Sequence, residues 1–512
     1  MQRKQLTLVI VSLLVVVLSV SLAYFTAQII GKGKDVSVTS ANLQIVFTDS
    51  DGALTETDIE PGWTKNKTFT IKNDTKTEYK YNIVIKDLLN TFVTNGYLQY
   101  KITSTNNGYN MTEFKDIPKS STPKDKVLAY SVSIPVGVTQ SYTIEFKYAN
   151  DESVDQSDDM GRKLSGTLFI TEGTEQPTLL SQILADNPTR STRSNNNNGT
   201  NNFATPLTAT TTGTLFTSTE SITGITDSPK EVYYYAGNTT NNWVKFAELY
   251  WRIIRTNHDG SIRLLYVGTS HDTTSGNIGT SKFNTNSDSP KYAGYKYGED
   301  TSLDTIRNNT TDSTIKTFID SWYKNNLTSY IKYLSTSAVY CNDRSEGTGQ
   351  TYNYASSPSS KFNFAPYYRM DYDTDGAKAN PSYDCTDIRD AFSVDNTSAK
   401  LDYPVSLMTA DEIAFAGGVA YQVMSTPYAW FISNSAGTQV SSYWWSLSPY
   451  YWNGSLARVW RWYSDNAYLE GDIVDFTNAV RPAISLKSCI KYSTGDGTYE
   501  TPYEIVETSS GC

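Results

Sequence analysis

The chain has 512 residues, which corresponds to roughly three domains of ordinary size. Hydrophobic residues make up 38% of the sequence and can fill several cores, whereas charged residues make up only 19%. The formal net charge of −10 argues against nucleic acid as the main partner, because phosphate binding requires a basic surface. The chain has only two histidines, no HExxH zinc motif and no pattern of a histidine-activated nucleophile, so we expect no enzymatic activity.

The first 30 residues predict a signal peptide or a transmembrane anchor helix. A short basic start containing Arg3 and Lys4 precedes an apolar run from residue 6 to residue 22, which weakens toward residue 30. A run of this length can span a bilayer, but a cleaved signal peptide has the same layout. Both alternatives stay open. In both, we expect the rest of the chain on the extracellular face of the cell membrane or secreted, with the membrane as a partner only through this helix.

The four cysteines fit an exported chain. No two of them have CxxC spacing, which disfavours a zinc site or thioredoxin-like chemistry. We expect structural disulfides, with free thiols as the alternative. Four cysteines allow three pairings, of which the choice local in sequence joins Cys341 to Cys385 and Cys489 to Cys512.

Residues 31–172 predict an all-β sandwich. Short runs alternate between apolar and polar residues, as in Leu43, Ile45 and Phe47, which is typical of strands with one buried face. Clusters of turn-forming residues separate seven or eight such runs, a number that suits two packed sheets. This region contains no cluster of acids, histidines or serines that indicates an active site.

The same region resembles the TasA/camelysin family of exported β-sandwich proteins, some of which build biofilm matrix fibres. The resemblance covers roughly residues 8–172. It rests on the motifs Ala23-Tyr24-Phe25-Thr26-Ala27, Ala41-Asn42-Leu43, Pro61-Gly62 and Phe69-Thr70-Ile71-Lys72-Asn73. It implies a structural module that could self-assemble. The protease activity ascribed to some members is not implied, because no metal-ligand spacing is present.

Residues 173–229 are expected to be a linker and a loop-rich entry to the last domain, which spans residues 230–512. In that domain, Asp259-Gly260 between two apolar runs predicts a hairpin, with His258 in solvent. Helical spacing predicts a helix from Thr314 to Leu334 that breaks near residues 325–326. The sequence Thr409-Ala410-Asp411-Glu412 predicts a capping box at the start of a second helix, which Gly417 ends.

An aromatic-rich stretch near the C-terminus is the candidate ligand-binding surface. Tyrosine and tryptophan give large, rigid contact areas, and the interleaved polar residues supply hydrogen bonds to a protein or a glycan. The alternative is a sheet with ordinary cross-strand aromatic pairs. The candidate ligand-binding residues are Tyr450, Tyr451, Trp452, Asn453, Arg458, Trp460, Trp462, Tyr463, Asp465, Asn466 and Tyr468.

This last domain resembles bacterial surface proteins with a C-type lectin-like fold, which is related to that of formylglycine-generating enzymes. The motifs recur in the same order over about 300 residues. They are Tyr250-Trp251-Arg252-Ile253-Ile254-Arg255, Cys341-Asn342-Asp343-Arg344, Leu407-Met408-Thr409-Ala410-Asp411-Glu412, Trp445-Ser446-Leu447-Ser448-Pro449 and Val480-Arg481-Pro482-Ala483-Ile484-Ser485-Leu486. The resemblance implies an α+β domain with two helices flanking a small sheet. The sequence departs from the calcium-bridged sugar site of lectins and lacks the close cysteine pair of the enzymes, so neither activity is implied.

One loop is a candidate calcium site. Asp371, Asp373 and Asp375 precede Gly376, which matches the first half of a calcium-binding loop, although the twelfth position is Ser382 instead of glutamate. The alternative is a solvated acidic loop. We otherwise expect no cofactor.

Taken together, the patterns predict a multidomain, non-enzymatic binding protein at the cell surface. A β-sandwich stalk would present a C-type lectin-like head that binds an extracellular protein or glycan. The alternative is a structural subunit of a biofilm matrix or fibre that assembles through the sandwich.

Overall fold

The computed structural model describes residues 35–40, 43–49, 54–56, 59–94, 96–193, 203, 207, 214–351, 361–370, 380–423, 430–440, 443–465 and 467–512. The chain forms two compact units, residues 1–176 and residues 177–512. The predicted signal or anchor helix, residues 1–30, lies outside the described residues. Among the residues that are described, no helix is both long enough and apolar enough to cross a membrane.

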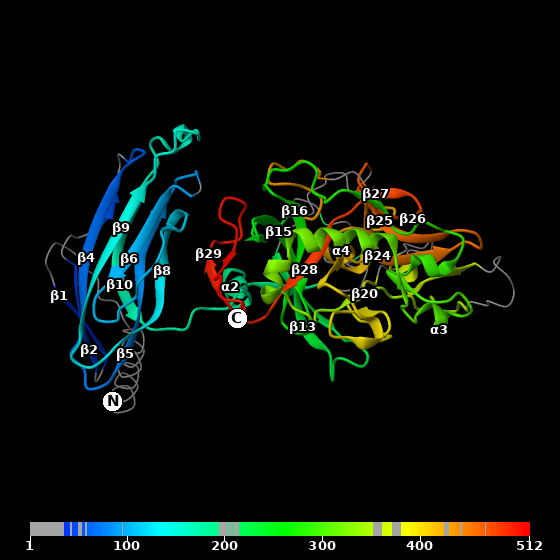
Figure 1. Ribbon diagram of the computed structural model, residues 1–512, viewed down its shortest axis with the longest axis horizontal. Helices are drawn as coiled ribbons and strands as arrows, with labels where there is room; N and C mark the ends of the chain where they lie inside the picture. Colours follow the sequence, from blue (N-terminus) through cyan, green and yellow to red (C-terminus); the bar gives the residue numbers. More distant parts are fainter. Residues whose placement is uncertain are drawn as a thin grey trace, which may run out of the picture. The chain divides into compact units, whose positions relative to one another are not determined.

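The first unit is a sandwich of two antiparallel sheets (Figure 1). The strand orders are β1-β2-β4-β9-β6-β7 and β3-β10-β5-β8. Its elements are β1 (Asp35–Ser40), β2 (Leu43–Asp49), β3 (Leu54–Glu56), β4 (Thr64–Asn73), β5 (Tyr79–Asn90), β6 (Leu98–Ser104), β7 (Lys115–Asp116), β8 (Ser120–Ile134), β9 (Thr139–Tyr148), the 3-10 helix η1 (Ser157–Asp159) and β10 (Leu164–Glu172).

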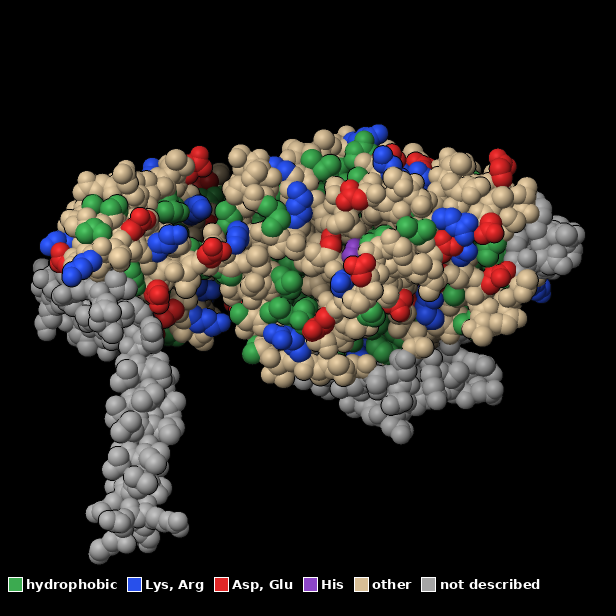
Figure 2. All heavy atoms as spheres, turned by 90° about the horizontal axis from the view of Figure 1, so that it is seen from below, with side chains coloured by type: hydrophobic (Ala, Val, Ile, Leu, Met, Phe, Trp, Pro, Cys, Tyr) green, Lys and Arg blue, Asp and Glu red, His purple; other side chains and the backbone are tan. Residues whose placement is uncertain are grey.

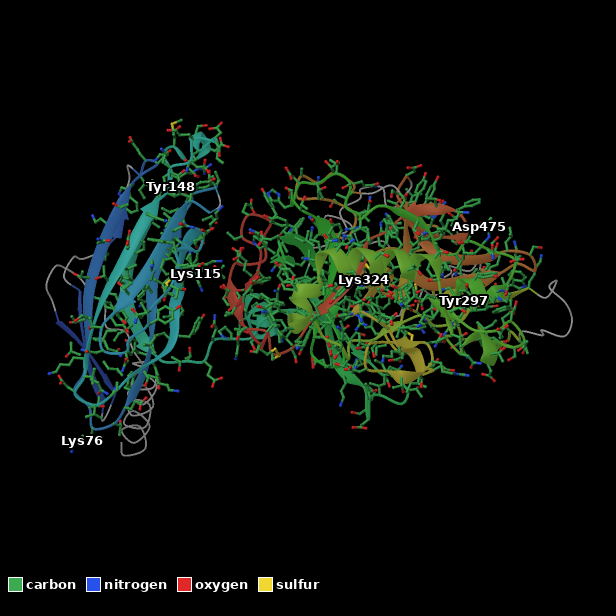
Figure 3. All side chains as sticks on the ribbon, viewed as in Figure 1. Lys76, Lys115, Tyr148, Tyr297, Lys324 and Asp475 are labelled. Carbon is green, nitrogen blue, oxygen red and sulfur yellow. A yellow bond between two sulfur atoms is a disulfide. The ribbon has the colours of Figure 1, made fainter. Side chains whose placement is uncertain are left out.

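The alternating runs of the sequence form strands of this sandwich, as predicted. Every second residue of β9 is buried, and these side chains share one hydrophobic core with side chains from β4, β5, β6 and β10. A buried polar group connects the two sheets, because the Tyr81 hydroxyl donates to Gln140 Oε1 at 2.6 Å. At another point of the core, the hydroxyl of Tyr148 (Figure 3) donates to Asp159 Oδ2 at 2.8 Å. The buried polar groups are thus hydrogen-bonded, as a stable core requires.

The second unit contains two larger sheets and several short helices. One sheet has the order β11-β12-β13-β15-β16-β28-β23, with β14 paired to β15, and the other has the order β17-β27-β24-β25-β26, with β21 paired to β24. Its elements are α2 (Leu179–Asp186), β11 (Arg190–Thr192), β12 (Thr214–Glu220), β13 (Lys230–Ala236), β14 (Trp243–Phe246), β15 (Leu249–Thr256), β16 (Ile262–Gly268), β17 (Thr280–Lys282), η2 (Pro290–Ala293), β18 (Lys296–Tyr297), α3 (Leu303–Ile306), β19 (Thr311–Asp312), α4 (Thr314–Asn326), η3 (Thr328–Tyr333), β20 (Tyr340–Cys341), β21 (Phe362–Asn363), α5 (Ala365–Met370), β22 (Ala391–Phe392), η5 (Thr397–Ala399), β23 (Val405–Leu407), α6 (Ala410–Ala416), β24 (Tyr443–Trp452), β25 (Ala457–Tyr463), β26 (Tyr468–Ile473), β27 (Thr477–Ala479), β28 (Pro482–Leu486), β29 (Tyr492–Thr494) and β30 (Glu504–Ile505).

The second unit begins earlier than the sequence suggested. Residues 177–229 were expected to belong to a linker and a loop-rich entry to the last domain, but α2, β12 and the sheet that contains β12 lie in the second unit. The apolar side chains of Leu179 and Ile183 on α2 join the core of this unit, as does Leu215 on β12.

Both predicted helices are present. Helix α4 ends at Asn326 and the 3-10 helix η3 continues to Tyr333, so the break falls where the spacing placed it. Helix α6 begins with the predicted capping box, in which Thr409 Oγ1 accepts from the Glu412 backbone and Glu412 Oε2 accepts from the Thr409 backbone. It ends at Gly417, which has the left-handed φ of 118°.

The two disulfides follow the pairing that is local in sequence. Cys341 pairs with Cys385, with their Cα atoms 5.8 Å apart, and Cys489 pairs with Cys512, at 5.7 Å. The second bond attaches the C-terminal residue to the second unit. Disulfides persist in oxidising compartments, which is consistent with an exported chain.

Candidate binding surface

The candidate binding surface lies on the sheet formed by β24, β25 and β26. These strands pair antiparallel, with Tyr443 opposite Tyr463 and Tyr463 opposite Tyr468. Side chains that lie opposite each other on neighbouring strands point to the same face, so the three tyrosine rings stand in one row. Aromatic residues pack well on a pleated surface, which explains why this stretch forms strands.

The tryptophans of this sheet belong to the core. Trp460 has no exposed surface, and the other four are at most 1% exposed. Burial corrects the expectation that Trp452, Trp460 and Trp462 contact a ligand directly, because indole rings bury the most apolar area when they are packed. Tyr450, at 6% exposure, is also mostly covered. The five buried tryptophans are Trp444, Trp445, Trp452, Trp460 and Trp462.

The tyrosine rings contact one another along the row, and the first pair is stacked. The rings of Tyr443 and Tyr463 are nearly parallel, at 7°, with centroids 4.8 Å apart. Tyr468 follows at 5.3 Å from Tyr463, and Tyr421 follows at 5.9 Å from Tyr468. Tyr421 precedes the sheet in sequence and is 46% exposed. Aromatic pairs at such distances stabilise one another beyond the area they bury.

The row continues into a second group of rings. Tyr421 lies 6.2 Å from Trp460, which in turn lies 4.5 Å from Tyr450. Tyr450 contacts Tyr451 at 4.5 Å and Tyr367 at 5.0 Å. We call the whole chain of rings the aromatic belt. Its members are Tyr443, Tyr463, Tyr468, Tyr421, Trp460, Tyr450, Tyr451, Tyr367 and Tyr368.

A glycine makes room for the second group. A Cβ atom at Gly471 would come within 2.0 Å of Cδ1 of Tyr450, so the ring lies directly on the backbone of β26. Gly471 is opposite Trp460 in the register, which places the two rings side by side. Glycine in a strand often marks such a close approach.

Charged side chains border the belt. Arg461 lies over the Tyr443 ring at 4.7 Å and pairs with Glu470 and Asp472, each at 2.5 Å. Asp465 is exposed and accepts a hydrogen bond from the Tyr443 hydroxyl, which raises the pKa of Tyr443. Arg458 lies 5.4 Å from the Tyr451 ring. The arginines are thus held against rings by carboxylates or by stacking.

The remaining predicted residues divide into two groups. Asn453 shapes the turn between β24 and β25, because its Oδ1 atom accepts from the backbones of Ser455 and Leu456 at 3.0 and 2.7 Å. Asn466 lies outside the described residues, as do the calcium candidates Asp371, Asp373 and Asp375. The belt residues that sequence reasoning missed are Tyr367, Tyr368, Tyr421 and Tyr443.

An acidic cluster elsewhere in the second unit already holds a cation of the protein itself. Carboxylate oxygens of Asp312, Asp320 and Asp402 lie close enough together to hold a metal ion. The Nζ atom of Lys316 lies 3.0, 2.6 and 2.7 Å from these three residues. Burial alone would lower the pKa of Lys316. The opposing effect of the surrounding carboxylates is larger, so the pKa lies above that of an ordinary lysine. The ammonium group therefore takes the place that a metal would need.

A buried charge network supports the sheet that carries β15 and β16. Beyond its capping role, Glu412 accepts hydrogen bonds from Arg255, at 2.8 Å, and Arg263. Arg255 also pairs with Glu220 at 2.8 Å. The side chain of His258 is only 8% exposed and lies 3.5 Å from Glu220, which corrects the expectation that it is in solvent. Each of these charged side chains has an oppositely charged partner within the protein, so a bound substrate is not needed to account for their burial.

No protein-family model and no curated protein matches the chain. Among solved structures, it is similar to one described as "AvmM Catalyzes Macrocyclization in Alchivemycin A Biosynthesis". That alignment covers 27% of this chain and 93% of the other, at 11% sequence identity and a TM-score of 0.15. A likeness of this degree carries no weight for the fold or the activity of this chain.

Proposed function

We propose that the protein is a non-enzymatic binding protein of the cell exterior, and that it binds its ligand through the rings of the aromatic belt that reach the surface. The observation that carries this proposal is the continuity of the belt. Nine aromatic rings from four separate parts of the second unit form one chain of contacts, and several of them remain open to solvent. Ordinary core packing does not require rings such as Tyr421 and Tyr368, at 46% and 41% exposure, to gather at one place.

The same proposal includes the finer fold and location. The first unit would be a TasA/camelysin-like stalk, and the second unit would have a C-type lectin-like fold. The sheet that contains β24 and the presence of α4 and α6 in the same unit support the latter. Residues 1–30 would place both units outside the membrane, which the two disulfides support.

The alternative of a fibre subunit is less favoured. Strand β8 is the long edge of the smaller sheet of the sandwich, and its exposed part contains Pro123, Lys124 and Asp125. Proline and charged residues on an edge strand discourage the addition of another strand. A fibre built from this unit would therefore need a contact other than strand addition at β8.

The test compares binding by the full chain and by variants that change only rings outside the buried core. Tyr421→Ser and Tyr463→Ser together remove one exposed and one half-buried member of the belt, while Tyr499→Ser removes an exposed tyrosine that contacts His271. We expect at least one member of a panel of immobilised glycans and extracellular matrix proteins to bind the native chain and the Tyr499→Ser control. The double variant should bind it at least 10-fold more weakly. Undiminished binding of every such probe by the double variant would contradict the proposal.

A further inference from the structure

The orientation of the belt rings restricts the kind of ligand that they can bind. Tyr463 is on the central strand of the three, so Tyr443 lies against one face of its ring and Tyr468 against the other. The guanidinium group of Arg461 lies over the ring of Tyr443. A sugar that binds by stacking needs an open ring face, and both faces of Tyr463 are already in contact with neighbouring rings.

Because its faces are covered, Tyr463 can offer a ligand only its ring edge and its phenolic hydroxyl. A tyrosine packed between two others offers its ring edge and its hydroxyl to a partner. It loses little conformational entropy on binding, because the neighbouring rings already hold it. Such groups are typical of the energetically important centres of protein–protein interfaces, which are enriched in tyrosine, tryptophan and arginine. The sheet that carries the row supplies tyrosines and, beside them, Arg458 and Arg461, whereas its tryptophans are buried.

The charge of the same hairpin indicates the complementary charge of the partner. Residues 457–476 contain two arginines, Arg458 and Arg461, against the four carboxylates of Asp465, Glu470, Asp472 and Asp475, a net charge of −2. Arg461 is occupied by Glu470 and Asp472, whereas Asp465 is exposed beside the row. Asp475 lies at the turn before β27 (Figure 3). Elsewhere, the face of the molecule in Figure 2 shows basic and acidic side chains interspersed.

We infer that the partner of the belt is a protein surface that carries a lysine or arginine, which pairs with Asp465 while neighbouring apolar groups of the partner pack on the edges of Tyr443, Tyr463 and Tyr468. This inference rests on the proposed function and narrows its ligand from protein or glycan to a basic protein surface. Opposite charges at an interface raise the rate of association and select the partner.

The test selects peptides from a random phage-displayed library on the immobilised full chain, and screens the same chain on a glycan array. Random peptides accumulate where a surface offers the most contact, so the library needs no knowledge of the natural partner. We expect the selected peptides to be enriched in lysine or arginine. Asp465→Asn should weaken their binding at least 10-fold, and raising the salt concentration should weaken binding to the native chain more than to the variant. The control Asp227→Asn, which removes an exposed carboxylate outside the belt, should change neither.

Two other outcomes are separable. A glycan that binds the native chain but not the variant with both Tyr421→Ser and Tyr463→Ser would overturn the inference and keep the proposed function. Selected peptides that need the tyrosines but contain no enriched basic residues would do the same. Peptides that bind equally to the native chain and to the double tyrosine variant would overturn both.

Discussion

The indole of Trp460 contacts Tyr421 and Tyr450 and belongs to the core of the second unit. We expect Trp460→Ala to lower the free energy of unfolding by about 3–5 kcal/mol, because the cavity left by a buried aromatic ring is only partly filled by relaxation. Trp460→Phe should cost much less, since the indole N–H has no hydrogen-bond partner among the described residues. Urea unfolding followed by far-ultraviolet circular dichroism gives both values. Equal stability of the alanine variant and the native chain would mean that the ring is not core.

Lys316 is the second residue whose environment makes a specific prediction. Replacing it with glutamine would remove the ammonium group and leave the carboxylates of Asp312, Asp320 and Asp402 facing one another. Hard divalent cations bind clusters of carboxylate oxygens, so calcium should raise the melting temperature of Lys316→Gln by several degrees. Calcium should not stabilise the native chain at this cluster. A variant that is destabilised but does not respond to calcium would show that the cluster cannot rearrange into a cation site.

At the scale of one element, two substitutions at the start of helix α6 distinguish the capping role of Glu412 from its role in the buried charge network. Thr409→Ala removes only the cap and should cost about 1 kcal/mol. Glu412→Gln retains a side-chain oxygen for the cap but leaves Arg255 and Arg263 without this charge in a buried place, and should cost about 3–5 kcal/mol. Chemical denaturation of the two variants measures both effects. A smaller loss for Glu412→Gln than for Thr409→Ala would mean that capping is its main role.

The same network makes the second unit sensitive to acid. Burial alone would raise the pKa of Glu220 above the ordinary 4.5. The opposing effect of Arg255 and His258 is larger, so the pKa of Glu220 is lowered to about 2. A carboxyl whose pKa is lower in the folded state stabilises the protein fully above its unfolded pKa, and this stabilisation is lost as the pH falls toward the folded pKa. We therefore expect the free energy of unfolding to fall between about pH 4.5 and 2. The slope should be shallower for Glu220→Gln, and an unchanged slope would exclude this carboxyl as its source.

The elements also show what a sequence pattern can and cannot predict. The alternation in Leu43, Ile45 and Phe47 and the capping box at Thr409 are local signals, and both elements form where they were predicted. The burial of Trp460 is not local, since it depends on which face of β25 meets the core. Tyr421 joins the belt by packing between distant segments. Nor does spacing reveal that Lys316 neutralises Asp402, 86 residues away.

At the scale of the whole molecule, the distribution of two residue types allows the units to be observed separately. Nine of the ten tryptophans and all four cysteines are in the second unit, and Trp63 is in the first. Tryptophan fluorescence therefore follows mainly the second unit, whereas circular dichroism follows the strands of both. Two compact units with their own cores are expected to unfold in two transitions.

Reduction should act on one of these transitions alone. The disulfides close loops of 44 and 23 residues, and each should stabilise the second unit by roughly 3–4 kcal/mol through the restricted unfolded chain. We expect a reducing agent to lower the melting temperature seen by fluorescence by several degrees and to leave the transition of the first unit unchanged. Cys489→Ser with Cys512→Ser isolates the C-terminal bond and should reproduce part of the shift. If both transitions moved together on reduction, the two units would have to be one cooperative structure, and the first unit could not be treated as separate from the second.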